Sequence, residues 1–490
     1  MTAQQILTVA QMREAEQALI DAGSSVEALM RIAGRGAAEW VWRVAARGCV
    51  TVVCGPGNNG GDGYVLAEAI RTRGGPISVI AAAGPRTEAA RAARQLYGGA
   101  LLDPDAQCHG EVLVDCLFGS GLTRPLSEAH AALLARLAAS HRLRVAIDLP
   151  SGVESDTGAL LNEGLPRFDL TLGLGAWKFA HFLMPSSPII GATRLVPIGV
   201  AAVEGAAQAI ARPALGAPDA DAHKYRRGLV AIVGGAMPGA AMLAAIAAQG
   251  AGAGYVKLLV GASARASTSS ARADIEPITT SAQAEPVEAR ALPPDLVVDH
   301  RPLAESAADS RIAALLIGPG LGRDDSARER LVTALAHPLP LVLDADALML
   351  LGPEQLAKLT APVIATPHDG ELTALEKAFG LPGTGPKPDR ARAMARASGM
   401  IVVAKGPDTL VAAPDGRLAC ATRASSWLST AGTGDVLAGV IASRLATGAE
   451  PFVAACEGVW LHGKAARLCA PAFTAGQLAA AVPAALAACL

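Results

Sequence analysis

Two glycine-rich segments, far apart in the chain, constrain its possible folds most strongly. Residues 57–63 read Gly-Asn-Asn-Gly-Gly-Asp-Gly and follow the apolar run 50–54, whereas residues 431–436 read Ala-Gly-Thr-Gly-Asp-Val. Glycines let backbone N–H groups approach a phosphate closely, and the free N–H groups at the start of a helix add partial positive charge. Each segment therefore predicts an anion-binding turn at the start of a helix. Two such turns in one chain predict two active sites.

The length of the chain and the pattern of its apolar runs predict two α/β domains. A chain of 490 residues exceeds one ordinary hydrophobic core. After a helical stretch at residues 10–46, short β-type runs alternate with helical patterns, which favours parallel sheets covered by helices. We expect strands at residues 51–54, 77–82, 112–116, 145–148 and 170–174, and a second series at 229–234, 255–260, 314–318, 341–344, 363–365 and 401–404.

A connection between the two domains is expected at residues 196–227, which lose regular strands and gain prolines and glycine. We place the boundary near Pro213, with one domain at residues 1–212 and the second at 213–490. Residues 262–291 are rich in Ala, Ser, Glu and Arg without a clear period, which predicts an exposed insertion with little order.

Charge and cysteine content exclude several classes of protein. A formal net charge of −2 at pH 7 lacks the positive excess of a protein that tracks nucleic acid. The eight cysteines contain no Cys-x-x-Cys pair, which favours buried, reduced thiols and a cytoplasmic location. No basic region precedes an apolar stretch at the N-terminus, and the apolar windows are short or interrupted by glycine and proline. Neither a secretion signal nor a membrane span is therefore expected.

Three expected strand ends in the first domain carry turns with polar or cationic groups. Residues 57–63 supply N–H groups and an amide, residues 119–124 supply a second glycine loop with a cation, and residues 148–152 supply the carboxylate of Asp148. Because functional groups in parallel sheets collect beyond the carboxyl ends of the strands, the loops could hold a phosphorylated ligand and Asp148 could act on it. Each loop taken alone is also compatible with a plain tight turn.

Oxygen-bearing side chains at the same strand ends indicate a possible cation site. Asn59, Asp115 and Ser151 lie at adjacent strand ends and offer ligands suited to a hard monovalent or divalent cation. Asp115 and Asp148 are equally compatible with simple capping of the turns that follow them.

These segments resemble the N-terminal module of the NAD(P)H-hydrate repair family, an epimerase that interconverts the R and S forms of hydrated NADH and NADPH. The resemblance lies in residues 57–63, 114–121 and 148–152 and in Lys178. It implies a Rossmann-like parallel-sheet domain, potassium held by Asn59, Asp115 and Ser151, and hydrate bound by Asn58, Asn59, Gly60, Gly61, Asp62, Gly119, Ser120, Gly121, Leu122, Thr123, Arg124 and Pro125.

The resemblance further implies that Asp148 contacts the reacting ring, with Lys178 as a second catalytic candidate. Epimerisation at the hydrated carbon requires reversible loss and return of oxygen or a proton-assisted tautomer, and a positioned carboxylate can shuttle the proton. Asp148 is the candidate for this role, and the sequence does not identify its partner. Lys178 is also compatible with a solvated surface charge.

The second glycine turn is followed by the apolar helical run 436–441, which places Asp435 at the start of a helix. This arrangement resembles the signature of ribokinase-like enzymes. In that fold the glycine turn stabilises charge on a transferring phosphoryl group, and the aspartate takes the proton from the attacking hydroxyl. The resemblance implies that Asp435 is a general base.

Three further segments of the second domain favour the same assignment, although each has an ordinary explanation. Residues 405–409 offer a cation and a turn for a nucleotide, and are also typical of a hairpin turn. Residues 318–322 permit close backbone approach, and are also compatible with a plain turn. Residues 366–371 place a histidine and acids at a strand end, where a single histidine is more often a satisfied polar group.

Together with His223, Lys224 and residues 235–248, these segments resemble the C-terminal module of the same family, the nucleotide-dependent hydrate dehydratase. The resemblance covers nearly the whole chain, apart from the insertion at 262–291. It implies that Asp435 contacts the hydrate, that Ala241, Gly320 and His368 line its pocket, and that the adenine nucleotide is bound by Lys405, Gly406, Pro407, Asp408, Thr409 and Gly434.

The implied ligands are hydrated NADH and NADPH (NADHX and NADPHX) and ADP or ATP as phosphoryl donor, with Mg²⁺ accompanying the nucleotide. Bacterial members of the family typically use ADP, but the sequence leaves the choice between the two nucleotides open. A homo-oligomer is compatible with the sequence, and neither a nucleic acid nor a membrane is an expected partner.

Two alternatives remain open at this level. A ribokinase-like small-molecule kinase fused to a nucleotide-binding interaction module would share Asp435, but it would leave the acid and lysine of the first domain unexplained. A nicotinamide-dependent dehydrogenase is disfavoured, because neither domain has a Gly-x-Gly-x-x-Gly turn followed by a ribose-binding acid at the expected interval.

Overall fold

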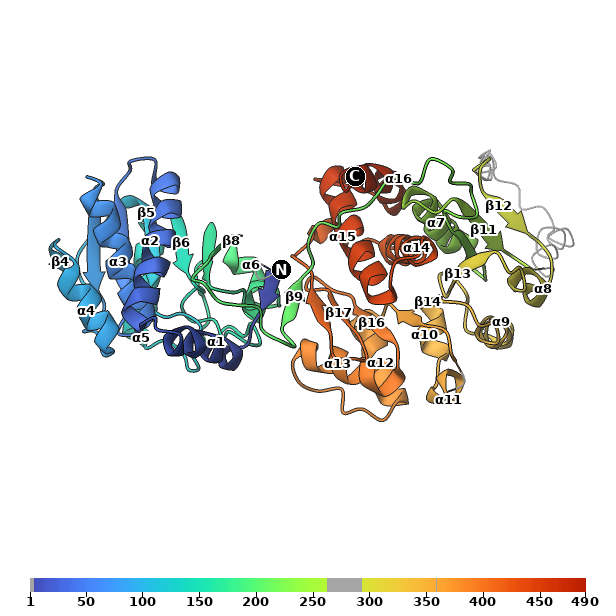
Figure 1. The fold of residues 1–490 in the computed structure, drawn as a ribbon, viewed down its shortest axis with the longest axis horizontal. Coiled ribbons are helices and arrows are strands. Elements are labelled where there is room, and N and C mark those ends of the chain that lie inside the picture. The colour runs from blue at the N-terminus through green and yellow to red at the C-terminus, as the bar shows by residue number, and fades with distance from the viewer. Residues whose placement is uncertain (1–3, 262–292, 358) are drawn as a thin grey trace, which may run out of the picture. The chain divides into compact units, whose positions relative to one another are not determined.

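The computed structural model describes residues 4–261, 293–357 and 359–490. The chain divides into two compact units, Met1–Ala209 and Ile210–Leu490 (Figure 1). Residues 262–291, predicted from the sequence to be an exposed insertion, lie outside the described residues.

The first unit is built on a seven-stranded parallel sheet in the order β4-β3-β2-β5-β6-β7-β8. Its central strands carry buried side chains on both faces, as expected where helices cover both sides. The strands are β2 (Val50–Cys54), β3 (Ile77–Ala81), β4 (Leu101–Leu102), β5 (Gly110–Cys116), β6 (His141–Ile147), β7 (Leu170–Leu174) and β8 (Ala192–Val196).

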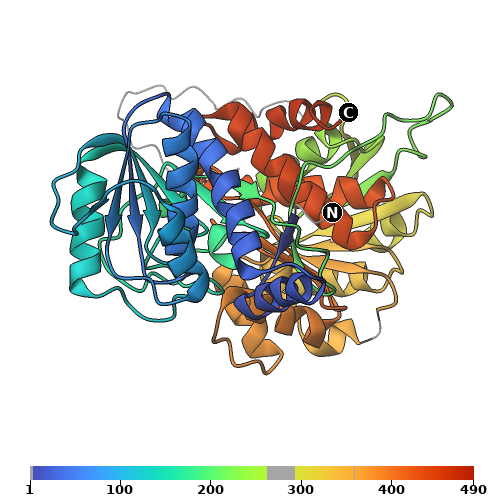
Figure 2. The same ribbon diagram turned by 60° about the vertical axis from the view of Figure 1, so that its left-hand side comes forward.

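Helices pack on the two faces of this sheet according to the alternation of its side chains. One core joins residues such as Val52 to α2 (Val26–Ala45), α3 (Asn58–Thr72) and α4 (Glu88–Leu96). The other joins residues such as Val53 to α5 (Glu128–Ala139). In Figure 2 the teal helix α5 accordingly lies on the opposite side of the sheet from the blue helices α2 and α3.

The N-terminal stretch forms two helices where the sequence predicted one helical stretch at 10–46. Helix α1 (Val9–Asp21) begins with a capping box between Thr8 and Gln11, and it is followed by Gly23 at φ +99°, which ends the helical path before α2. Before α1, β1 (Gln5–Ile6) pairs antiparallel with β9 (Ala207–Ala209), and Ile6 forms a bridge with Trp177.

The second unit contains the strand order β18-β17-β16-β15-β14-β13-β10-β11-β12. The strands from β16 to β12 pair in parallel, and β16, β17 and β18 form an antiparallel meander. Their bounds are β10 (Leu229–Val233), β11 (Tyr255–Leu259), β12 (Val297–Asp299), β13 (Ile312–Ile317), β14 (Leu341–Leu343), β15 (Val363–Ala365), β16 (Ile401–Ala404), β17 (Leu410–Ala412) and β18 (Leu418–Cys420).

Alanine-rich helices pack closely on this sheet and on one another. Helices α7 (Pro238–Gly250), α14 (Thr433–Ala446) and α15 (Pro451–Cys469) share one core with the strands, and α16 (Ala475–Ala487) packs on the outer side of α7, α14 and α15. The closest approach is at Gly439 of α14, where a Cβ would lie 2.1 Å from the carbonyl oxygen of Ala244 in α7. The predicted fold class, α/β in both units, is confirmed, and every expected strand is present.

The remaining helices of the second unit lie between its strands in the chain. They are α8 (Leu303–Ala307), α9 (Asp325–Leu335), α10 (Asp346–Leu350), α11 (Pro353–Leu356), α12 (Asp369–Ala378) and α13 (Lys387–Ser398), and the first unit also has α6 (Ser187–Ile190). Among the helices of the described residues, none combines the length and apolarity needed to span a membrane. All eight cysteines are free and five are buried, but Cys49 is exposed and Cys456 and Cys469 are partly buried, so the expected burial of the thiols does not extend to these three.

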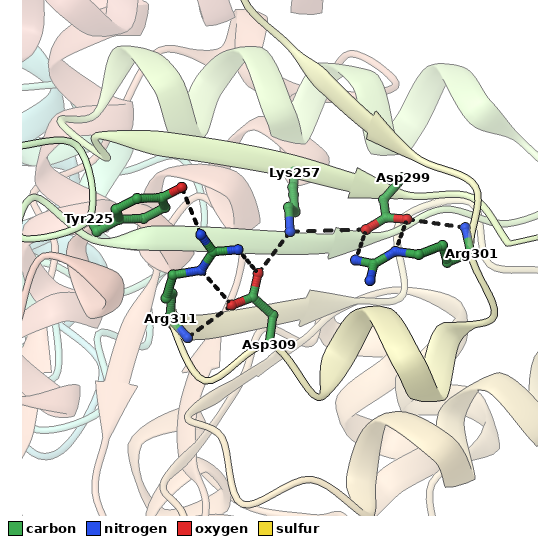
Figure 3. A network of polar contacts seen from close by, with 6 residues as sticks. All are labelled: Tyr225, Lys257, Asp299, Arg301, Asp309 and Arg311. Carbon is green, nitrogen blue, oxygen red and sulfur yellow. Dashed lines mark hydrogen bonds and ion pairs between the residues drawn. The ribbon is translucent and has the colours of Figure 1, made fainter.

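A network of charges in the second unit ties β11 and β12 to the segment that leads into β13 (Figure 3). Lys257 of β11 donates to Asp309 at 2.9 Å and lies 4.0 Å from Asp299, and its side chain is only 7% exposed. Arg311 and Arg301 each pair with one of these carboxylates through two hydrogen bonds. Each carboxylate therefore has an arginine of its own, whereas the buried ammonium depends on Asp309.

Removing Asp309 should cost more stability than removing the lysine it binds. Asp309→Asn leaves the Lys257 ammonium with a carboxylate only at 4.0 Å, and an uncompensated buried charge costs about 3 kcal/mol. Lys257→Met leaves both carboxylates paired with arginine and should cost about 1 kcal/mol. Urea unfolding of the full chain measures both values.

Asp415→Asn provides the matched control, because Asp415 and Arg417 form a pair that is about half exposed on both sides. Its change in unfolding free energy should stay within about 0.5 kcal/mol. A larger loss of unfolding free energy in Lys257→Met than in Asp309→Asn would contradict this prediction.

Candidate active sites

The first glycine segment forms the turn between β2 and α3. Gly57 is the N-cap of α3, without a side chain to occupy the N–H groups of the first turn. A Cβ at Gly60 would lie 2.0 Å from the carbonyl oxygen of Gly55, and a Cβ at Gly55 would lie 1.8 Å from that of Leu117. Only glycine therefore lets this turn run beside the chain that leaves β5.

A buried ion pair lies at the carboxyl ends of β6 and β7. The Nζ of Lys178 is 2.5 Å from Oδ1 of Asp148 and 2.7 Å from the carbonyl oxygen of Leu174, and the Lys178 side chain is 1% exposed. The backbone N–H of Ser120 donates to Oδ2 of Asp148 at 3.0 Å. The structure thus brings together Asp148, Lys178 and Ser120, and Lys178 is not a solvated surface charge.

The surroundings of Asp148 keep it ionised. Burial alone would raise the pKa of Asp148, but the Lys178 charge and the hydrogen bonds outweigh burial and hold the pKa below its usual value. Its backbone has φ +66°, a strained conformation that is tolerated best by Asn and Asp among non-glycine residues. Next to the pair, burial and the Lys178 charge lower the pKa of His181 to about 4, so this imidazole is neutral.

Asn59, Asp115 and Ser151 lie at the same edge of the sheet. Ser151 donates its N–H and its hydroxyl to Asp115 at 2.9 and 2.7 Å, and the N–H of Leu117 also donates to Asp115. Asp115 therefore does cap the turn after its strand. Burial raises the pKa of Asp115 to about 6 despite these hydrogen bonds. The amide of Asn59 is buried, and neither of its polar atoms has a hydrogen-bond partner among the described residues.

The second predicted loop of the first unit is divided between the surface and the interior. Gly119 lies against the site, since a Cβ there would be 3.1 Å from Oδ2 of Asp148 and 3.3 Å from Oδ1 of Asn59. Leu122 is buried, and the rest of this predicted binding loop is exposed, namely Gly121, Thr123, Arg124 and Pro125. On the α3 turn, Asn58 is exposed and Gly60, Gly61 and Asp62 are buried.

The second glycine segment forms the start of α14 in the second unit. Gly432 is the N-cap at φ +91°, and a Cβ there would lie 2.8 Å from Leu243. Thr433 fixes the preceding chain by donating its hydroxyl to the carbonyl oxygens of Leu428 and Thr430 at 2.7 and 2.8 Å. Asp435 lies in the first turn of the helix and is half-buried.

Lys405 joins this helix start to the end of β14 and to the first turn of α12. Its Nζ is 2.7 Å from Oδ1 of Asp344 and 3.8 Å from Oε2 of Glu371, and a Cβ at Gly434 would lie 3.4 Å from it. Burial alone would lower the pKa of Lys405, but the charges of Asp344 and Glu371 outweigh burial and raise it. Lys405 therefore carries a fixed positive charge beside the α14 turn.

The electrostatics around Asp435 favour partial protonation in the absence of ligand. Burial raises the pKa of Asp435 to about 6, the Asp344 charge adds to the rise, and the Lys405 charge opposes it. A carboxylate with a pKa near neutrality is a better proton acceptor than an unperturbed aspartate. The sequence did not single out Asp344, which ends an expected strand, and it included Glu371 only among the acids of residues 366–371.

Residues 405–409 form the hairpin turn between β16 and β17, in which Ala404 pairs with Leu410. Gly406 and Thr409 close the turn through a hydrogen bond of 3.2 Å, and Asp408 forms an ion pair of 2.6 Å with Lys387. The segment therefore has the conformation of an ordinary hairpin turn. The Lys405 side chain extends from this turn to Asp344 and Glu371. Pro407 is exposed.

His368 caps α12. Its Nδ1 accepts from the N–H of Glu371 at 3.2 Å, and its own N–H donates to the Glu371 carboxylate at 2.8 Å. Gly320, at φ +62°, approaches Met237 so closely that a Cβ would lie 2.3 Å from the Met237 carbonyl oxygen. Met237 leads into α7, whose Ala241 is buried. A contact of these residues with a ligand stays a prediction.

Comparison with known proteins identifies the family. The family model of the YjeF-related protein N-terminus matches residues 26–180, and that of the NAD(P)H-hydrate dehydratase matches residues 230–486. The bifunctional NAD(P)H-hydrate repair enzyme of Salinibacter ruber is 33% identical over 512 residues, which cover 94% of this chain and 91% of that protein. The Gloeobacter violaceus enzyme of the same name is 34% identical, covering 94% and 92%.

The chain belongs to the family of bifunctional NAD(P)H-hydrate repair enzymes. Among solved structures, the ADP/ATP-dependent NAD(P)H-hydrate dehydratase from Bacillus subtilis, co-crystallised with ATP/Mg²⁺, is 26% identical, with a TM-score of 0.46 and coverage of 56% of this chain and 95% of that one. The recognition made from the sequence motifs is confirmed by the relatives that match along both units.

Substitution of the buried pair in the first unit should show strong coupling. Lys178→Met leaves the Asp148 carboxylate buried without its ammonium partner, at a cost of about 3–5 kcal/mol in unfolding free energy. Asp148→Asn, which tolerates the positive φ, leaves the ammonium in the same situation. The double variant removes both charges, so its cost should be well below the sum of the single costs. Urea unfolding of the four proteins measures the coupling, and additive costs would contradict the pair as described.

Proposed function

We propose that the chain repairs hydrated NADH and NADPH at two separate sites. The domain at residues 1–212 epimerises the R and S hydrates, and the ribokinase-like domain at residues 213–490 dehydrates the S hydrate to NAD(P)H at the expense of ADP, giving AMP and phosphate. The observation that carries this proposal is that each unit has its own acid under the influence of a lysine: Asp148 forms a buried ion pair with Lys178, and the charge of Lys405 acts on Asp435. A single-activity enzyme would need only one of these sites.

In the second unit, Asp435 acts as the general base of the dehydration. It takes the proton from the hydroxyl on the hydrated carbon while that oxygen attacks the terminal phosphorus of ADP and AMP leaves. Hydroxide leaves a saturated carbon poorly, whereas phosphate leaves readily. Loss of phosphate and of a proton from the neighbouring carbon then restores the dihydronicotinamide ring.

The groups around Asp435 suit this reaction. The N–H groups at the start of α14 and the fixed charge of Lys405 would stabilise negative charge on the phosphates. Gly406, Pro407, Asp408, Thr409 and Gly434 would contact the nucleotide, and Ala241, Gly320 and His368 would line the hydrate pocket.

Carboxylates of the second unit fit a magnesium ion that arrives with the nucleotide. Among the described residues, no three His, Cys, Asp or Glu side chains form a metal-binding group of their own. Mg²⁺ is usually held by one or two carboxylates together with substrate phosphates. Asp344 and Glu371 could supply carboxylate oxygens to the ion, which would neutralise charge on the phosphates.

In the first unit, Lys178 would hold the Asp148 carboxylate in place, and Asp148 would face the ring of the hydrate. The α3 turn, with Asn58, Asn59, Gly60, Gly61 and Asp62, and the loop of residues 119–125 would bind the rest of the hydrate. The buried amide of Asn59, which has no hydrogen-bond partner in the described part of the chain, and the buried Asp115 carboxylate fit a potassium ion, together with Ser151. That ion would balance the Asp115 charge and fix the loops.

Substitution of the two acids should separate the two activities. Asp435→Ala should reduce dehydration by about 100- to 10,000-fold, because a general base is lost, and should leave epimerisation unchanged. Recovery of the absorbance of reduced nicotinamide from S hydrate and ADP measures the first activity. Conversion of purified R hydrate to S hydrate measures the second.

Asp148→Ala is the reciprocal control, with epimerisation lost and dehydration of S hydrate retained. Loss of both activities in either variant would refute two separate sites. Accumulation of a stable phosphorylated product, without recovery of the reduced nicotinamide, would instead support a small-molecule kinase.

Removal of potassium should weaken the first unit selectively. Replacing KCl with tetramethylammonium chloride at equal ionic strength should slow epimerisation and lower the thermal unfolding midpoint of the full chain. A ligand at 100 times its dissociation constant stabilises a fold by about 2.7 kcal/mol. The Asn59→Ala variant should show the same epimerisation rate and thermal unfolding midpoint in both salts. Dehydration by the second unit of the parent chain should keep its rate in both salts. Equal midpoints in both salts for the parent chain would refute the cation site.

A further inference from the structure

The backbone of Asp148 forms a strained turn directly after β6. The N–H of Leu149 donates to the carbonyl oxygen of Ile147 at 2.9 Å, which closes a tight turn around Asp148, and Asp148 itself has φ +66°. A turn of this kind, with a positive φ at its central residue, is rare and strained. Such strain persists only where surrounding contacts hold it. The contacts of the Asp148 backbone therefore decide where its carboxylate points.

Two hydrogen bonds hold this backbone, one on each side of the residue. The N–H of Asp148 donates to the carbonyl oxygen of Leu172 in β7 at 2.8 Å. On the other side, Nε2 of His181 lies 3.0 Å from the carbonyl oxygen of Asp148. His181 ends the short 3₁₀ helix Phe179–His181, which follows Lys178. The first contact is a bond between two strand ends, whereas the second depends on the identity of a side chain.

The contacts of the His181 imidazole define its tautomer. The N–H of Lys178 donates to Nδ1 at 2.9 Å, so Nδ1 carries no hydrogen, and Nε2 therefore carries it and donates to Asp148. Nδ1 also lies 3.2 Å from the Lys178 carbonyl oxygen, which is the longest of the three contacts. Burial and the Lys178 charge lower the pKa of His181, which keeps the ring neutral near neutral pH.

The imidazole is also confined from its sides. The Trp177 ring meets it edge to face, with ring centroids 5.3 Å apart, and a Cβ at Gly173 of β7 would lie 3.4 Å from its Nε2. The residue is 7% exposed. A buried ring that is bound at both nitrogens has one orientation. His181 therefore links the backbones of both members of the Asp148–Lys178 pair.

We propose that His181 is a positioning residue of the epimerase site. By donating to the Asp148 carbonyl oxygen and accepting from the Lys178 N–H, it holds the strained turn in the orientation that aims the Asp148 carboxylate at the hydrate ring. The inference rests on the proposed epimerase function of the first unit. His181 acts through Asp148 and transfers no proton itself.

The test is the kcat and the KM of R-to-S conversion by the full chain, with purified R hydrate as the probe and potassium present. His181→Asn places an amide oxygen where Nδ1 lies, so it keeps the bond from Lys178 but loses the bond to Asp148. We expect kcat to fall about 100-fold, because a misplacement of about 1 Å at a reacting group costs this much. KM should stay unchanged.

His181→Gln is the rescue variant. Its amide nitrogen can lie where Nε2 lies and donate to the Asp148 carbonyl oxygen. Its kcat should return to within about tenfold of the parent value, as expected when only the bond from Lys178 is lost. The difference between the two amides isolates the bond to Asp148 from general damage to the buried site.

His141, at the amino end of β6, offers a matched control. It is 6% exposed, and its ring nitrogens lie 2.8 Å from the Leu137 carbonyl oxygen and 2.8 Å from the Thr51 hydroxyl. His141→Asn should therefore lower the midpoint of urea unfolding as His181→Asn does. Because it lies at the opposite end of the strand from Asp148, it should leave kcat and KM unchanged.

Equal losses of kcat in His181→Asn and His181→Gln would overturn the inference, as would a higher KM with unchanged kcat or an equal fall of kcat in His141→Asn. If His181→Asn does not fold, His181→Phe, which keeps an aromatic ring beside Trp177, should show the same loss of kcat. In all these cases the parent chain would still epimerise, so the proposed function would stand. No conversion by the parent chain would overturn the epimerase function and this inference together.

Discussion

An ion pair between a lysine ammonium and a carboxylate at the carboxyl edge of a parallel sheet is the constraint common to both units. Lys178 is bound to Asp148 in the first unit, and Lys405 is bound to Asp344 in the second. A charge taken out of water is costly unless a partner of opposite sign and further hydrogen bonds replace the solvent. In the first unit the partners include the Leu174 carbonyl oxygen and the Ser120 N–H. The pairs therefore fix the loops around them as well as the charges.

Close backbone contact at glycine makes these edges possible. Gly55 and Gly60 let the α3 turn run beside the chain after β5, and Gly439 lets α14 lie on α7. In each case a Cβ would overlap a carbonyl oxygen, so the approach cannot be achieved by shifting a flexible side chain. The N–H groups at the two helix starts are consequently held at positions set by the sheets, which suits binding of a rigid anionic ligand.

The sequence was sufficient for the parts of the fold that depend on local pattern. Every expected strand is present, because short apolar runs bounded by glycine and proline are strong local signals. The break at Gly23 between α1 and α2 was missed, since the apolar periodicity continues across it. The hairpin at residues 405–409 and the cap formed by His368 are likewise local features, and their ordinary explanations are correct as to conformation.

The contacts that join distant segments could not be predicted in this way. Lys178 is compatible with a surface position until its pairing with Asp148, 30 residues earlier, is known. The segment before α1 is joined to the residue before Lys178 by backbone hydrogen bonds between Leu7 and Trp177, and no side-chain pattern encodes that pairing. The roles assigned to the remaining loop residues rest on family resemblance and stay predictions.

The two sites use the same kinds of group with opposite electrostatic results. In the first unit the ammonium contacts the acid expected to face the ring, so the pKa of Asp148 stays below its usual value and the carboxylate stays ionised. In the second unit the ammonium contacts Asp344 and acts on Asp435 only from a distance, so burial raises the pKa of Asp435 to about 6. Because a general base works best with a pKa near the working pH, Asp435 is better suited than Asp148 to accept a proton. The position of one lysine relative to its acids therefore distinguishes an orienting carboxylate from a basic one.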